Sequence, residues 1–165
     1  MKTLLITIAT IFYAFISIAQ TERDRDFIVG SSQDGLLEVK LGELAQTRGL
    51  SPEVRDLGRM MVEQHTQTNA ALAALAAKKN VTVMNILDVK HQEMYDKMAK
   101  LQGRDFDKKY AKCTAKSHKR AVCKYKKEAK MSNDKDIAAW AAAQVPEMEQ
   151  HLHMSRKTCD ATKDM

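Results

Sequence analysis

The sequence has few glycines and prolines, the residues that form turns, and few aromatic residues. Its 165 residues include 6 glycines and 2 prolines, and only 5% are aromatic. So few turn-forming residues predict long elements, and the apolar/polar alternation typical of strands is absent. Alanine, leucine, lysine and glutamate dominate, which favours helix. Motifs for nucleophilic hydrolysis, phosphate loops and nucleotide binding are also missing, so the sequence does not indicate these enzyme classes.

One apolar run is long enough to insert into a membrane. It lies at the start of the chain, in MKTLLITIATIFYAFISIA, residues 1–19. A lysine precedes it, small residues end it and the charged stretch TERDRD follows, as in a secretory signal cleaved before Gln20. We therefore expect residues 20–165 to form a single exported domain without a transmembrane segment. It would be periplasmic or extracellular, and soluble or peripherally associated with the envelope.

Helical periodicity predicts five helices, at about 26–47, 51–79, 86–101, 105–130 and 134–157. Two tight hairpins joined by a longer crossover predict an all-α four-helix bundle. A short extra helix lies in the crossover between the second and third long helices. One long crossover is typical of ferritin-like folds.

Several residues suggest where these helices begin and end. Gly49 is expected to adopt the left-handed cap conformation, with Leu50 folded back onto the last turn. Ser51 is a good N-cap for the second helix. Gly103 should close the short helix, and Pro146 should kink the last one.

Three helices each carry one histidine on the expected core face. His65 stands in a row with Met61 and Leu72, and His118 and His151 occupy equivalent rows on the third and fourth long helices. Glu38 lies near the core face of the first helix, and a second glutamate lies one turn before His151. The candidate constellation is Glu38, His65, His118, Glu147 and His151.

These residue types suit zinc, iron or manganese, because imidazole and carboxylate are their usual ligands. The other interpretation is structural: His65 would be a register-fixing hydrogen-bond donor in the core. The hairpin spacing argues against a tight cluster, since it offsets His118 from His151 by about five residues, or about 7 Å. It places Glu147 closer to His118 than His151 is.

A di-iron centre is not indicated. Di-iron bundles use Glu-x-x-His pairs, but Val62, Ala115 and Met148 stand three residues before the core histidines. The remaining acidic-x-x-His pair is Asp88 and His91, on the crossover helix.

The chain has three cysteines, Cys113, Cys123 and Cys159. The first two are ten residues apart on one helix, or about 15 Å, which is too far for a disulfide. Any bond must therefore involve Cys159, and the pair Cys113–Cys159 is the candidate. Free thiols throughout are the alternative.

The third long helix is strongly basic. Such a face can bind an anionic envelope lipid or polysaccharide, although a solvated surface is its usual meaning. Aromatic residues are sparse along it, so nucleic acid is not expected as a partner. The basic residues are Lys108, Lys109, Lys112, Lys116, Lys119, Arg120, Lys124, Lys126, Lys127 and Lys130.

The chain resembles the DUF4142 family, bacterial proteins of unknown function placed near the ferritin-like bundles. The resemblance rests on DGLLEVKLGELA, SPEVRDLGRMMVEQHTQTNAAL, LQGRDFDKKY and AAWAAAQVPEMEQHL, in that order. It implies an exported helical bundle and no established catalytic activity. The sequence therefore favours a non-enzymatic binding or stress-related module of the envelope. The alternative is a ferritin-like metal-binding bundle that uses inward histidines and glutamates in a redox or protective role.

Overall fold

The computed structural model describes the backbone of residues 2–164 and the side chains of residues 22–164. The predicted secretory signal, residues 1–19, lies outside the described side chains. Within residues 2–164 the elements are all helices: α1 (Lys2–Arg48), α2 (Pro52–Lys78), α3 (Val89–Ala99), α4 (Gly103–Met131) and α5 (Lys135–Thr162). The prediction of an all-α bundle of four long helices and a short fifth is confirmed.

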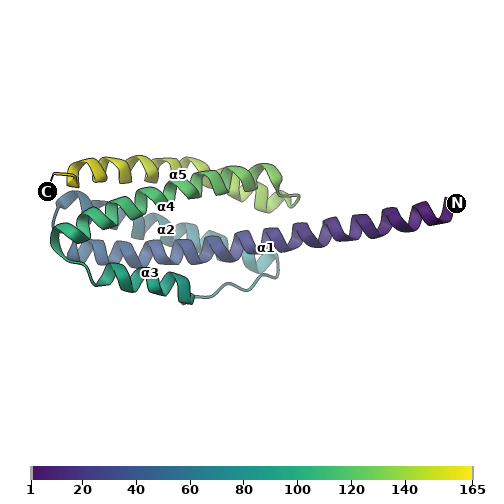
Figure 1. Cartoon of the computed structure of the whole chain (residues 1–165), viewed down its shortest axis with the longest axis horizontal. Helices are drawn as coiled ribbons and strands as arrows, with labels where there is room; N and C mark the ends of the chain where they lie inside the picture. The colour runs from purple at the N-terminus through teal and green to yellow at the C-terminus, as the bar shows by residue number, and fades with distance from the viewer. Residues whose placement is uncertain (1, 165) are drawn as a thin grey trace.

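The four long helices form two antiparallel hairpins (Figure 1). α1 packs along α2 and α4 along α5, whereas α1 and α4 touch at fewer points. The segment between α2 and α4 crosses from one hairpin to the other and carries α3, which packs mainly against α1. The two hairpins therefore touch each other much less than the helices within each hairpin do, and α3 lies beside the seam between α1 and α4.

The turn between α1 and α2 is held by a residue far along the chain. Asp107 of α4, fully buried, accepts hydrogen bonds from the Leu50 N–H (3.0 Å) and the Ser51 N–H (2.7 Å). The predicted left-handed cap is wrong, since Gly49 does not have a positive φ. A Cβ there would lie 2.6 Å from the Ala45 carbonyl oxygen, so glycine allows a close turn instead. Leu50 is 53% exposed and does not fold back.

The crossover is fastened to α1 by one glutamine. The Gln33 amide donates to the Ile86 carbonyl (3.0 Å), and its oxygen accepts from the Asp88 N–H (2.8 Å). α3 begins at Val89, three residues later than predicted, because the Asp88 carboxylate caps it by accepting from the His91 N–H (2.8 Å).

The other helix boundaries are partly as predicted. Ser51 caps α2, as expected, and Asp134 caps α5. Gly103 begins α4 with a φ of +57° instead of ending α3. α5 continues to Thr162, five residues beyond the prediction. Pro146 lies inside α5, and the expected kink there stays a prediction.

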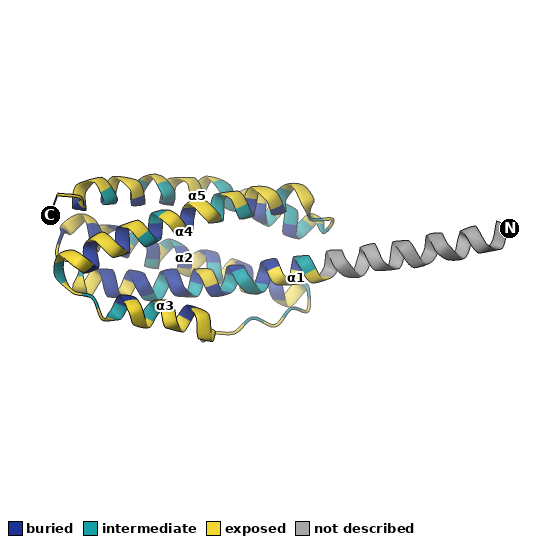
Figure 2. Ribbon diagram, viewed as in Figure 1, coloured by how far each residue is buried: buried dark blue, intermediate teal, exposed yellow. Residues whose placement is uncertain are grey.

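Buried residues follow the inward sides of the helices (Figure 2). They form two apolar layers, and a polar layer lies between them along the helices. The Phe106 layer consists of Leu37, Leu41, Leu44, Ala45, Val54, Leu57, Met61, Met98, Phe106 and Tyr110. The Phe27 layer consists of Phe27, Ile28, Leu72, Leu75, Ala76, Tyr125, Ile137, Ala141 and Met148. The histidine layer between them consists of Glu38, His65, Thr68, Thr114, His118 and His151. Across the described residues, we find no helix with the length and apolar character needed to span a membrane.

Candidate metal centre

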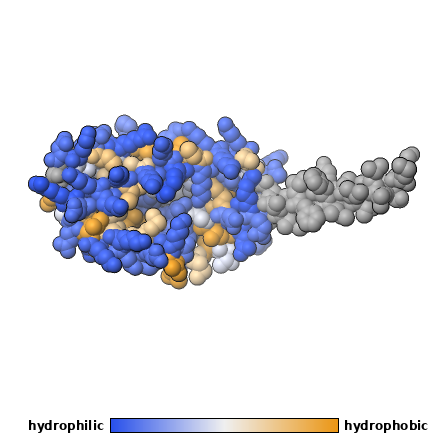
Figure 3. All heavy atoms as spheres, viewed as in Figure 1, coloured by the Kyte–Doolittle hydropathy of each residue, from blue (hydrophilic) through white to orange (hydrophobic). Residues whose placement is uncertain are grey.

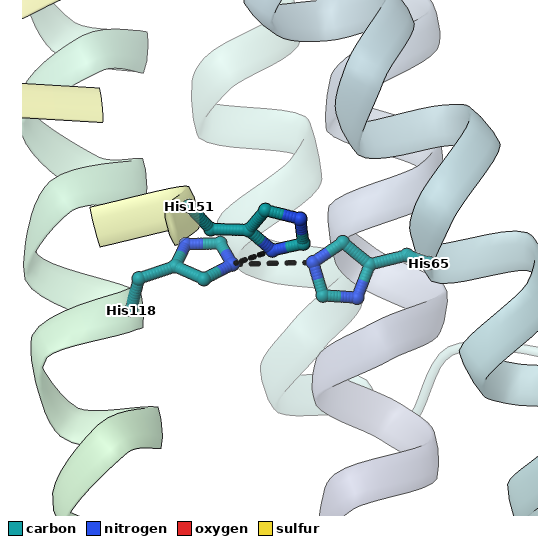
Figure 4. Close-up of side chains that lie close together, drawn as sticks. All are labelled: His65, His118 and His151. Carbon is teal, nitrogen blue, oxygen red and sulfur yellow. Dashed lines mark hydrogen bonds between the residues drawn. The ribbon is translucent and has the colours of Figure 1, made fainter. Parts of the chain in front are cut away.

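The predicted core faces bring three histidines together. His65 of α2, His118 of α4 and His151 of α5 are 5%, 1% and 0% exposed, and their rings converge (Figure 4). The His118 Nε2 lies 3.2 Å from the His65 Nε2 and 3.1 Å from the His151 Nδ1. One nitrogen from each ring lies within 4.8 Å of the other two.

The predicted offset between His118 and His151 is wrong. Side chains on a helix lean toward its N-terminus. His151 is farther from the α4–α5 turn than His118, so its ring leans toward the turn, while the His118 ring on the antiparallel helix leans away from it. The two inclinations close the gap that counting residues along the axis had left open.

The outward nitrogens of two rings have acceptors of their own. The His118 Nδ1 lies 3.0 Å from the Thr114 carbonyl oxygen, which can only accept, so this nitrogen carries the proton. The His151 Nε2 contacts the Gln64 Oε1 and donates to it. A partner of this kind on the second nitrogen fixes the tautomer and orientation of histidines that bind metal.

These assignments leave no proton for a hydrogen bond between the facing nitrogens of His118 and His151. If His118 and His151 each carry one proton, on the outer nitrogen, the His118 Nε2 and the His151 Nδ1 direct lone pairs at each other across 3.1 Å. If the oxygen and nitrogen of the Gln64 amide were exchanged, Gln64 would donate to the His151 Nε2. The proton of the His151 ring would then lie on its Nδ1 and point at the His118 Nε2. The single lone pair of His118 would then be shared with the donor from His65. A cation among the three nitrogens satisfies all of them at once.

Burial keeps two of the rings uncharged. Desolvation lowers the pKa of His65 well below its usual value, and His118 and His151 lower it further. The pKa of His151 falls to about 3, first through burial and then through His118. Neutral imidazole is the form that binds a metal ion.

The two candidate glutamates lie outside the group of converging nitrogens. Glu38 is buried beside His118, and its Oε1 accepts from the Ser117 hydroxyl (2.6 Å). Burial raises the pKa of Glu38, while His118 and Ser117 oppose the rise. Glu147 accepts from the Thr68 hydroxyl (2.9 Å), so it is occupied on the neighbouring turn.

A cavity of about 500 Å³ adjoins the cluster. Its wall includes His65, His118 and Glu38, and it runs from the core toward the seam between α1 and α4, beside α3. An ion held by the three rings would thus have one side near open space.

The sequence did not single out two residues that support the cluster, Gln64 and Thr114. Thr114 could have been found, because it lies one turn before His118 and its carbonyl is within reach of the ring. Gln64 gave no signal, since it lies beside the predicted core row rather than in it.

The other candidate residues lie apart from the cluster. His91 contacts Asp88 (2.7 Å) and Asp34 (3.3 Å), which attaches α3 to α1. Cys113 and Cys159 are free thiols. Burial is the main cause of the raised pKa of Cys159, followed by the charge of Asp160. Cys113 lies near enough to raise it slightly further. Their disulfide stays a prediction.

The fold and site define an all-α bundle with a buried cluster of three histidines. Residues 17–158 match the family model described as a domain of unknown function, DUF4142, and the chain belongs to that family. The resemblance read from the sequence is thereby confirmed. Neither a curated protein nor a solved structure matches the chain.

Proposed function

We propose that this protein binds one divalent transition-metal ion through His65, His118 and His151. The observation that carries the proposal is the convergence of three ring nitrogens of which two have their outer N–H groups committed. Zinc–nitrogen bonds of 2.0–2.1 Å in a tetrahedron require nitrogens about 3.3 Å apart. The two separations from the His118 Nε2, 3.1 and 3.2 Å, are close to this value, and the nitrogens of His65 and His151 lie within 4.8 Å of each other.

Zinc fits the donor set best. Three imidazoles without a carboxylate suit zinc, whereas manganese prefers oxygen ligands and iron centres in helical bundles draw on several glutamates. Metal sites of helical bundles are built from inward side chains on facing helices, which supports the proposal. The residues three before each histidine are not acidic, so the proposed centre holds one ion rather than two.

Three protein ligands leave a fourth position, as in catalytic zinc sites, where water or another ligand completes the tetrahedron. Glu38 stands near that side, in the cavity wall. We propose no reaction for the site. The alternative of a purely binding or stress-related module has no comparable cluster of residues in its support.

Metal-dependent stability tests the proposal. Protein purified without an affinity tag is stripped with chelator and melted with and without Zn²⁺, Fe²⁺ or Mn²⁺. At a free metal concentration 100 times Kd, folding gains about 2.7 kcal/mol, which raises Tm by about 5–10 °C for a chain of this size. His65→Ala, His118→Ala and His151→Ala should each abolish the rise.

His153→Ala is the matched control, because this exposed histidine lies two residues after His151 on the same helix. It should keep the full rise in Tm. The proposal fails if the wild type shows no rise, or if the rise survives in all three triad variants. The structural interpretation, in which the rings only hydrogen-bond to one another, gives the first pattern, whereas the second would place the bound metal elsewhere on the protein.

We also infer that residues 1–19 direct export and are removed. Their charged start, apolar run and small-residue end support this. Mass spectrometry of the native protein should find a chain beginning at or near Gln20. Envelope-located protein that retains Met1 would contradict the inference.

A further inference from the structure

The cavity beside the histidine layer has a basic mouth. Three of its lining residues, Lys90 of α3 and Lys116 and Arg120 of α4, are exposed. None of the three forms a salt bridge with a carboxylate in the described part of the chain. The lining carboxylate Asp34 is already engaged, since it pairs with Lys124 (3.0 Å). The mouth therefore presents cations that make no direct ion pair, although Arg120 interacts with Glu38 and Lys90 with Asp88 at longer range.

Behind this mouth the wall is largely apolar. On the face seen in Figure 3, hydrophobic residues are interspersed among the hydrophilic residues that cover most of the surface. The apolar and aromatic lining residues are Leu37, Leu41, Leu72, Met94, Tyr125 and Met148. Glu38 is the acidic group of the inner wall, and the Ser117 hydrogen bond and the charge of Arg120 stabilise its ionised form.

Size, polarity and charge together define a ligand. A volume of about 500 Å³ lies within the range of about 300–1,000 Å³ that is usual for small-molecule sites. Apolar walls bind a hydrocarbon or ring, and unpaired cations at a mouth attract and hold an anionic head. An isolated surface charge run would lack the apolar chamber that opens directly behind these three residues.

We propose that the cavity binds an amphiphilic organic acid. Its carboxylate lies between Lys90, Lys116 and Arg120, and its apolar body extends inward toward the histidine layer. The proposal does not depend on metal, because the head is held by exposed side chains of α3 and α4 and not by the buried rings. It goes beyond the proposed metal-binding function.

Decanoate serves as the probe, used below its micelle-forming concentration and with chelator present, so that the result is independent of the metal proposal. Isothermal titration calorimetry should show saturable binding of one decanoate per chain. 1-Decanol, which has the same chain and no charge, should bind at least about tenfold more weakly, because it lacks the ion-paired head.

Two triple variants that each remove three positive charges test where the decanoate carboxylate binds. Lys90→Ser/Lys116→Ser/Arg120→Ser should weaken decanoate binding by about tenfold or more. The control Lys108→Ser/Lys127→Ser/Lys130→Ser removes three exposed cations of α4 that do not line the cavity, and it should bind like wild type. Equal weakening in both variants would assign the effect to overall charge and overturn the proposal.

Ala121→Phe tests the apolar chamber. Ala121 lines the cavity and is only half-buried, so a larger side chain there occupies cavity volume. The variant should reduce decanoate binding strongly while keeping a helical circular dichroism spectrum. Unchanged binding in this folded variant, or no decanoate binding by the wild type, would overturn the proposal.

Discussion

The Phe106 layer and the histidine layer occupy neighbouring levels of one core, yet they are built on different principles. In the Phe106 layer, Phe106 and Tyr110 stack with ring centroids 5.8 Å apart among leucines and methionines. In the histidine layer, His118 and Glu38 are as deeply buried, but their environment is polar. Apolar burial stabilises the fold outright, whereas buried polar groups cost stability unless every one is paired.

This contrast separates a layer that stabilises the fold from a layer that costs stability. An uninterrupted apolar core would stabilise the packing of the four helices more than buried imidazoles and a carboxylate do, because apolar groups carry no desolvation cost. The histidine layer still contains buried polar atoms without a partner in the described structure, among them the Glu38 Oε2. Core positions that sacrifice stability in this way are typical of functional sites.

The largest expected effect comes from breaking the apolar layer. Phe106→Ala removes a fully buried ring and should lower the free energy of unfolding by about 3–5 kcal/mol. Urea denaturation measures the loss, which should be the same with and without metal. A loss below 1 kcal/mol would show that the Phe106 layer does not carry the fold.

Asp107→Ala should have the next largest effect. Its carboxylate caps the turn between α1 and α2 through two backbone N–H groups, one of them fully buried. Leaving these donors unpaired should cost about 2–4 kcal/mol. Asp107→Asn, which can still accept one of the bonds, is the matched comparison and should lose less. Equal losses in the two variants would contradict the capping role.

The histidine layer should make the stability of the metal-free protein depend on pH. Folding lowers the pKa of His65 and His151, so the unfolded chain binds more protons below pH 6.5. Stability is therefore complete above that pH and falls as the pH drops toward about 3, with a slope of at most about 1.4 kcal/mol per pH unit for each ring. Denaturant melts between pH 4 and 8 measure it.

His151→Leu sharpens this test, because it removes one titrating ring and keeps an apolar side chain of similar size. Its stability should fall less steeply with acid than that of the wild type. Phe106→Ala, by contrast, should shift the whole profile down without changing its slope. A profile for His151→Leu parallel to that of the wild type would contradict the assigned cause.

Glu38→Gln should have the smallest effect, and its sign is informative. Burial raises the pKa of Glu38, so its ionised form costs stability at neutral pH and that cost disappears as the pH falls. The glutamine variant should be slightly more stable than wild type at pH 8, and the difference should shrink toward pH 4. A less stable variant at pH 8 would show that the carboxylate is needed as a charge.

The sequence by itself determined the helices and their inward faces. Met61, His65 and Leu72, which were predicted to share the core face of α2, are all buried. Apolar spacing of three and four residues defines such a face because it follows from helix geometry alone. Ser51 likewise predicted where α2 begins, since capping is a local interaction. For the same reason the sequence placed one histidine of each of three helices on the inside.

Only the tertiary structure decided what those inward residues meet. The position of His151 against His118 depends on how two helices lean across a hairpin, and counting residues misplaced it. Asp107 replaced the expected glycine cap from a distance of more than fifty residues, and Gln64 oriented His151 from another helix. Such contacts join residues that are far apart in sequence. They arise from packing, and no local pattern records them.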